Sequence, residues 1–202
     1  MLTLSLLLTT VIAPQTGQAV QPEPAMQPAK VTVGSKLEDT LAAQGFAPST
    51  NFPKPLTTPT KDKGLVITGG GTGCRGTIGD TVLSIVNYSD EVIWFPAQDS
   101  RLDIIREAMT KDGKWKPIEY LMQSTCGNSF HRVALGPREY WQVNLGKDHG
   151  TVATQVRFRF NLKGKTLYSS PYPTTISANA FQLPKEYSRY EFRDDGFLAF
   201  RP

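Results

Sequence analysis

The chain has 202 residues, a formal net charge of +4 and only two cysteines. Its basic residues are scattered and form no Lys/Arg stripe with interleaved aromatic residues, which is the pattern that tracks a phosphate backbone. The charge therefore argues against a nucleic acid as partner, and solubility with mild affinity for an anionic envelope explains it. Neither cysteine has a second Cys or a His at metal-ligand spacing, so we expect no metal site and no cofactor.

The first residues of the chain predict export. Residues 1–13 form an apolar run that is too short to span a bilayer, which takes roughly 20 apolar residues. Gly17 and Ala19 place small residues for cleavage before Val20, although no Lys or Arg precedes the apolar run. We therefore expect residues 1–19 to be a signal peptide. The mature protein would have no membrane span and would lie in the periplasm or outside the cell.

Residues 20–63 have the composition of a linker. They are rich in Pro, Thr, Gln and Ala, a mixture that buries too little apolar surface to order itself. Within them, Ser35 and Glu38 form a capping box, and Gly45 stands where a helix would end. We expect one short helix in an otherwise disordered region, either weakly docked on the following domain or solvated.

From residue 64 onward the hydrophobic period changes to two. Short alternating segments separated by turn residues are typical of an all-β sandwich. The expected strands lie at residues 65–67, 81–87, 91–95, 115–121, 133–135, 140–145, 154–160 and 167–170. The strand at 154–160 alternates strictly, with Arg157 and Arg159 on the face opposite its apolar residues. We predict one immunoglobulin-like or fibronectin-like antiparallel β-sandwich over residues 64–183.

Residues 101–110 fit both a helix and a strand. Leu102, Ile105 and Met109 fall at helical spacing. As a strand, the segment would pair with residues 115–121 across a loop that contains Asp-Gly, a strong hairpin signal. The period does not separate the two, and we favour the strand because both neighbouring segments are strands.

The glycine-rich segment at residues 71–76 matches the nucleotide-binding pattern G-x-G-x-x-G. That site needs the last glycine to open a helix, whereas the residues that follow here are β-branched and predict a strand. We therefore predict no nucleotide. A simpler role is to let the backbone approach Cys126 so that Cys74 forms a disulfide with it. Such a bond would close a loop of about 50 residues and stabilise the fold by about 4 kcal/mol. Two free buried thiols are the alternative.

Cys126 and His131 also suggest a Cys/His hydrolase. This chemistry requires a thiolate, His as its base, and Asn128 or Glu119 to orient the ring. A disulfide at Cys126 competes with it, and Cys and His five residues apart on a strand face opposite sides unless the chain kinks. A protease inhibitor is a further alternative, with a reactive loop near residues 125–130 braced by Cys126.

Aromatic residues are frequent in the predicted sandwich. They are Trp94, Trp115, Trp141, Tyr120 and Tyr140. They fit either a flat sugar-binding platform or the core of a small sandwich, and we favour the core. The candidate binding residues, for an envelope protein or glycan, are Trp115, Glu119, Tyr120, Asn128 and His131.

Residues 184–202 form an aromatic C-terminal tail. It holds too many aromatic residues for a free tail in water. Asp194-Asp195-Gly196 predicts the turn of a small hairpin. The tail either docks on the sandwich or binds a partner.

Several strings of the chain resemble a set of exported bacterial proteins of unknown function with an immunoglobulin-like or fibronectin-like sandwich. They are W-K-P-I-E-Y at 115–120, C-G-N-S-F-H at 126–131, E-Y-W at 139–141, T-x-V-R-F-R-F at 154–160 and Y-S-S at 168–170. The resemblance covers roughly residues 80–181 by the strand assignment, and it implies no catalytic residue. A looser likeness, in strand layout only, is to small β-sandwich proteinase inhibitors. We expect a non-enzymatic exported binding or structural module of the cell envelope.

Overall fold

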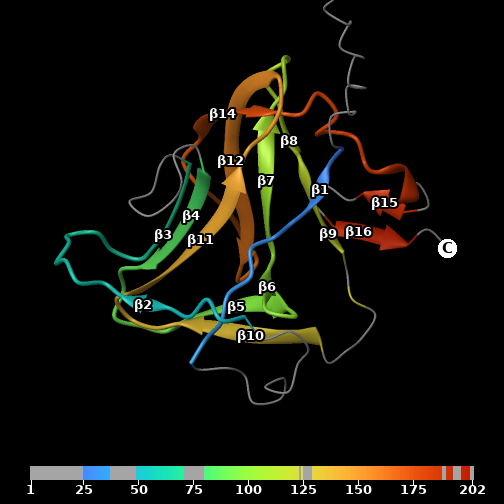
Figure 1. Ribbon diagram of the computed structural model, residues 1–202. Helices are drawn as coiled ribbons and strands as arrows, with labels where there is room; N and C mark the ends of the chain where they lie inside the picture. The colour runs from blue at the N-terminus through green and yellow to red at the C-terminus, as the bar shows by residue number, and fades with distance from the viewer. Residues whose placement is uncertain are drawn as a thin grey trace, which may run out of the picture.

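The computed structural model describes residues 25–36, 49–70, 80–122, 124, 129–187, 190–192 and 197–200. These residues form strands and a 3-10 turn, Lys185–Tyr187, and they contain no α-helix. The fold is all-β with several antiparallel sheets, an arrangement consistent with a β-sandwich (Figure 1). No helix among these residues is long and apolar enough to cross a membrane. The predicted signal peptide lies outside them.

Two sheets supply most of the core. One has the strand order β2 (Lys54–Pro55), β11 (Glu139–Lys147), β4 (Asp80–Asn87) and β3 (Leu65–Gly69). The other has the order β13 (Lys165–Tyr168), β12 (Val152–Leu162), β7 (Ile104–Met109) and β8 (Trp115–Pro117), and β14 (Tyr172–Ile176) pairs with the first part of β12. In Figure 1 the first sheet lies to the left of β7 and β12.

Two smaller sheets complete the molecule. The three-stranded one has the order β10 (Phe130–Leu135), β5 (Ile93–Gln98) and β6 (Arg101–Leu102). The other has the order β1 (Gln27–Pro28), β9 (Glu119–Met122), β16 (Phe197–Phe200) and β15 (Tyr190–Phe192), and it joins both ends of the described chain. Figure 1 shows the three-stranded sheet below β7 and the C-terminal strands beside β9.

The main core lies between these sheets. Most of its apolar residues come from β3, β4, β5, β7, β10, β11, β12 and β14. Trp141 is fully buried, packs edge-on against Phe95 at 5.4 Å between ring centroids, and donates its indole N–H to the Gly34 carbonyl at 2.9 Å. The alternation predicted for the strand at 154–160 is confirmed, because Val156, Phe158 and Phe160 are buried in this core. Trp141 therefore serves the core, as favoured for the aromatic residues.

Residues 101–110 are strands, as predicted. They form β6 and β7, and β7 pairs antiparallel with β8 in the register Met109↔Trp115. Gly113 takes a φ of +77° in the connecting loop, where a side chain would be strained. The strand expected to end at residue 95 instead continues through Pro96 to Gln98. Proline is tolerated there because β6 pairs only with residues 97 and 98.

Residues 25–35 correct the expected linker, because they cross the molecule as part of its core. Val31 and Val33 are fully buried, and their backbones bond to Leu102 and Ser100 at 2.9 Å each. Ser35 donates to the Ala134 carbonyl at 2.8 Å and accepts from its N–H at 3.1 Å. The average composition of the segment concealed a local period of two, with buried residues at 29, 31 and 33 and exposed ones at 30 and 32. The predicted helix after Ser35 lies largely outside the described residues.

The aromatic tail forms a hairpin that docks on the sandwich. Strands β15 and β16 pair antiparallel, as predicted, although the turn itself lies outside the described residues. Strand β16 adds in parallel to β9 with Phe197 opposite Leu121. Phe197 packs there against Ala29, Ile105 and Leu121, so the tail covers the outer side of β7.

Candidate functional site

Strand β7 carries charged side chains on both of its faces. Ile104 and Ala108 belong to the main core, and Arg106 alternates with them, so it points toward the same side. Ile105 belongs to a separate apolar cluster on the outer side of β7. Glu107, two residues further along the strand, points toward the same outer side. Each charged residue is the centre of a cluster, and the two clusters differ in their charge balance.

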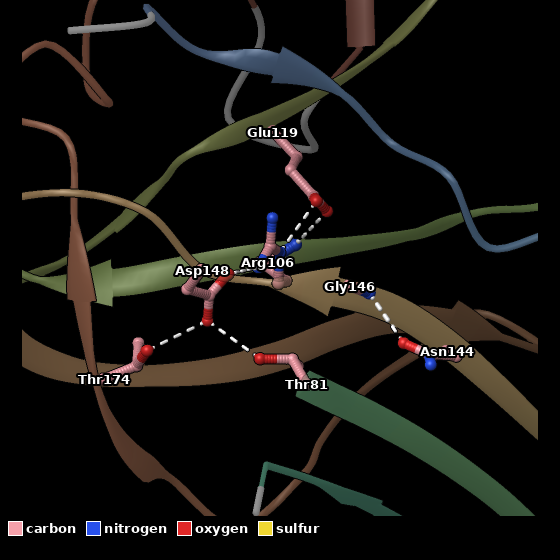
Figure 2. Close-up of polar contacts among 7 residues, drawn as sticks. All are labelled: Thr81, Arg106, Glu119, Asn144, Gly146, Asp148 and Thr174. Carbon is pink, nitrogen blue, oxygen red and sulfur yellow. Dashed lines mark hydrogen bonds and ion pairs between the residues drawn. The ribbon is translucent and has the colours of Figure 1, made fainter. Parts of the chain in front are cut away.

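On the core side, Glu119 holds Arg106 (Figure 2). Its Oε1 accepts from Arg106 Nε at 2.7 Å, and its Oε2 accepts from the Arg106 backbone N–H at 3.0 Å. The carboxylate thereby takes the place of a strand carbonyl just beyond the end of β8, where Ile118 still donates to the Arg106 carbonyl at 3.0 Å. The Glu119 side chain is only 3% exposed, so this ion pair is buried.

Asp148 closes the cluster from the opposite side. Its Oδ1 accepts from Arg106 Nη1, and its Oδ2 accepts from the hydroxyls of Thr81 at 2.9 Å and Thr174 at 3.0 Å. Asp148 follows an irregularity at the end of β11, where Asn144 Oδ1 accepts from the Gly146 N–H at 2.7 Å (Figure 2). The cluster therefore ties β7, β4, β14 and the segment after β11 together.

In the core-side cluster every charged group has a hydrogen-bond partner, although two carboxylates face one guanidinium. Burial would lower the pKa of the Arg106 guanidinium, but the carboxylates of Glu119 and Asp148 raise it above its usual value. Burial raises the pKa of Tyr172, beside this cluster, to about 12. Every oxygen of both carboxylates has a partner, so Glu119 is held in a structural ion pair. It is not placed to orient a catalytic histidine.

On the outer side, one carboxylate meets two guanidiniums. Glu107 Oε2 accepts from Arg157 Nε at 2.9 Å and pairs with its Nη2 at 2.8 Å, and Glu107 Oε1 accepts from Arg159 Nη1 at 2.8 Å. The side chains are 4%, 19% and 12% exposed, respectively. Positions 157 and 159 point outward, as the alternation of β12 predicted. This cluster carries one positive charge in excess.

Two aromatic rings hold Arg157 in place. Its guanidinium carbon lies 4.3 Å from the Trp115 ring centroid and 3.9 Å from that of Tyr168. Both distances are within the range of cation–π attraction. Trp115, a predicted binding residue, is thus fixed at the edge of the outer cluster.

A cavity of about 630 Å³ opens beside this cluster. Its apolar lining is provided by Met26, Trp115, Pro117, Phe181 and Leu183. Its charged lining is provided by Glu107, Arg159, Lys114 and Lys116. The volume lies within the range of small-molecule sites, which are mostly apolar and contain a few placed polar groups. The cavity is therefore our candidate binding site.

Arg159 leaves one hydrogen-bonding group of the site without a partner. Its Nη2 is buried and makes no hydrogen bond within the described part of the chain. An unpaired donor on a charged group is costly when it is shielded from water. Lys114 and Lys116 lie exposed at the rim, where Lys114 pairs with Asp112 at 3.1 Å and Lys116 adds positive charge.

Two other hollows are weaker candidates. One of about 900 Å³ adjoins Phe181, but its charged residues, Lys111, Asp112 and Lys116, are all exposed. One of about 240 Å³ is lined in part by Arg106 and Asp148, whose charges are already paired with each other. Neither hollow combines a buried, unsatisfied charge with an apolar wall.

The structure brings only some of the predicted binding residues together. Trp115 lines the cavity, and Tyr120 is buried against Met26 with its ring 5.2 Å from that of Tyr187, so it supports the cavity wall. His131 lies on β10, which belongs to another sheet, with its Nδ1 3.1 Å from the Ser129 carbonyl oxygen.

Other predictions fall on residues that the structure does not describe. They concern Asn128, the glycine-rich segment 71–76, and the disulfide between Cys74 and Cys126. The hydrolase and the inhibitor loop depend on the same part of the chain. Among the described residues, no group of three or more His, Cys, Asp or Glu side chains is placed to hold a metal ion.

No pattern in the sequence predicts Arg159 or Glu107 as a site residue. The alternation at residues 154–160 predicts only that Arg157 and Arg159 share one polar face of a strand, and such a face is usually solvated. The aromatic residues at 115 and 168 are the signal in the sequence that could have indicated a site here, because aromatic rings beside arginines favour cation–π contacts. The ion pairs of Glu107 with Arg157 and Arg159 could be identified only from the register of β7 against β12.

No family model matches the chain, and no curated protein or solved structure matches it either. The resemblance to exported bacterial sandwich proteins therefore stays a prediction.

Proposed function

We propose that the protein is an exported, non-enzymatic binding module of the cell envelope, built on an immunoglobulin-like sandwich, and that its ligand site is the cavity beside Arg159. The observation that carries the proposal is the combination of an apolar wall with a buried guanidinium that lacks one hydrogen-bond partner. Sites for small molecules commonly have this composition. The apolar run at residues 1–13 supports the location.

Ligand binding is tested with the full chain. A library of small aromatic and aliphatic compounds, with acidic, neutral and basic members, is screened by thermal unfolding, because a ligand that binds only the folded state raises its stability. We expect at least one class to raise the melting temperature, and this effect to be lost in Trp115→Ala. Trp94→Ala is the matched control, since Trp94 is also half-buried and stacks on an arginine, Arg132, in another sheet. Stabilisation by no class, or equal loss in both variants, would contradict the proposal.

Export is tested separately by fusing residues 1–24 to a phosphatase that folds only in an oxidising compartment. Phosphatase activity in bacterial cells is the expected result. An inactive fusion that remains in the cytoplasm would contradict export by residues 1–24 and would leave the proposed binding site unaffected.

A further inference from the structure

The cluster beside the cavity carries an excess of positive charge. Glu107 provides one negative charge for the two guanidiniums of Arg157 and Arg159. The cluster on the core side of β7 has the opposite ratio, with two carboxylates around one guanidinium, but there each carboxylate oxygen already accepts a hydrogen bond. A buried excess charge is costly unless it is paired. The outer cluster therefore favours an incoming anion, and the exposed Lys116 at the rim increases that preference.

The Arg159 guanidinium also lacks one hydrogen-bond acceptor. Arg159 Nη1 is bonded to Glu107 at 2.8 Å, whereas Nη2 is buried and has no partner among the described residues. A carboxylate oxygen would satisfy Nη2 with a charge-assisted hydrogen bond, which is stronger than a neutral one. Because Nη2 is shielded from water in the ligand-free chain, binding requires a rotamer change that uncovers it, and such changes are common on binding.

The remaining wall of the cavity selects the other end of the ligand. Met26, Phe181 and Leu183 present apolar surface, and Trp115 adds an aromatic face that is fixed against Arg157. A volume of about 630 Å³ accommodates a small molecule or a few residues of a peptide. A small inorganic ion would leave this apolar surface in contact with water.

We infer that the cavity binds a monoanionic carboxylate joined to an apolar or aromatic body, with the carboxylate on Arg159 Nη2 and the body against Trp115, Phe181 and Leu183. The inference rests on the proposed function, since it names the ligand class of the same cavity. A free organic acid and the C-terminus of a peptide share this chemistry.

A matched pair of compounds tests the inference on the unaltered protein. Calorimetric titration of the full chain compares 4-phenylbutyrate with its amide, which has the same body and no charge. We expect the acid to bind at least about tenfold more tightly, as one charge-assisted hydrogen bond allows. Phenyl phosphate and inorganic phosphate test other anions, and we expect inorganic phosphate not to bind. The dipeptide N-acetyl-Ala-Phe, with a free or an amidated C-terminus, tests the peptide source.

Variants then locate the charge preference. Arg159→Gln should remove the preference for the acid over the amide, whereas Arg132→Gln, which removes one exposed positive charge on β10, should preserve it. Arg159→Lys keeps the charge without the planar fork and should retain only part of the preference. Circular dichroism and the melting temperature show whether each variant is folded. If Arg159→Gln does not fold, the comparison of acid and amide on the unaltered protein still decides.

The two ways of failing are distinct. Equal binding of acid and amide, or a preference that survives Arg159→Gln, would overturn the inference and leave a binding module for neutral ligands. Tighter binding of phenyl phosphate by tenfold would replace the carboxylate with a phosphate. If none of these compounds binds and the screen finds no other ligand that depends on Trp115, the proposed function itself fails.

Discussion

Glu119→Gln removes a buried negative charge without changing the shape of the side chain. In the native protein its two oxygens accept from Arg106 Nε at 2.7 Å and from the Arg106 backbone N–H at 3.0 Å. Glutamine has one acceptor and one amino group, so in either orientation of the amide one donor of Arg106 faces another donor. The substitution therefore breaks one hydrogen bond and creates a repulsive contact in a buried site.

We expect the substitution to lower the free energy of unfolding by about 2–3 kcal/mol. Breaking a buried ion pair by removing one partner costs about 3–5 kcal/mol, because the other charge is left uncompensated. Asp148 still pairs with Arg106 here, and one hydrogen bond to the amide oxygen remains, so the loss lies below that range. Arg106 also retains its contacts in the core, so no cavity term is added.

Urea unfolding of the full chain measures the difference. The midpoint should decrease while the dependence on urea concentration stays constant, which indicates an unchanged surface of unfolding. Arg138→Gln is the control, because it breaks an exposed pair with Asp90, at 3.3 Å, that is worth about 0–1 kcal/mol. If Glu119→Gln lies within about 0.5 kcal/mol of the native protein, a range typical of surface substitutions, then Asp148 alone compensates Arg106 and our view of Glu119 is wrong.

Three further predictions concern the core, the N-terminal segment and the cysteines. Because burial raises the pKa of Tyr172 to about 12, the folded state keeps a proton that the unfolded chain loses near pH 10, so its contribution to stability is present below pH 10 and is lost between pH 10 and about 12. Between pH 9 and pH 11.5, the melting temperature should decrease less for Tyr172→Phe than for the native protein, and equal decreases would refute this. Val33→Ala should cost about 2 kcal/mol in urea unfolding, whereas the exposed Thr32→Ala should cost less than about 0.5 kcal/mol; a free linker would make both neutral. Peptide mapping without reductant should yield one peptide pair joined by Cys74 and Cys126, and recovery of both as free thiols would exclude the disulfide.

The strands and several of their pairings were predictable from the sequence because they depend on local patterns. The alternation at residues 154–160 placed Phe158 inward and Arg159 outward, and the Asp-Gly pair identified the loop between β7 and β8. The same period of two runs through residues 29–33. The proline-rich composition of the surrounding residues predicts a linker instead, because an average over residues 20–63 hides so short an alternation.

The partners of the charged side chains were decided by the tertiary structure alone. Arg106 meets Glu119 from 13 residues away and Asp148 from 42, while Arg159 meets Glu107 from 52. A period of two tells which face of a strand a side chain occupies, but neither which strand lies beside it nor in what register. Those depend on how the sheets assemble around the core. The sequence thus determined an all-β chain with Arg157 and Arg159 on one outer face, and the register of β7 against β12 placed one carboxylate between two guanidiniums.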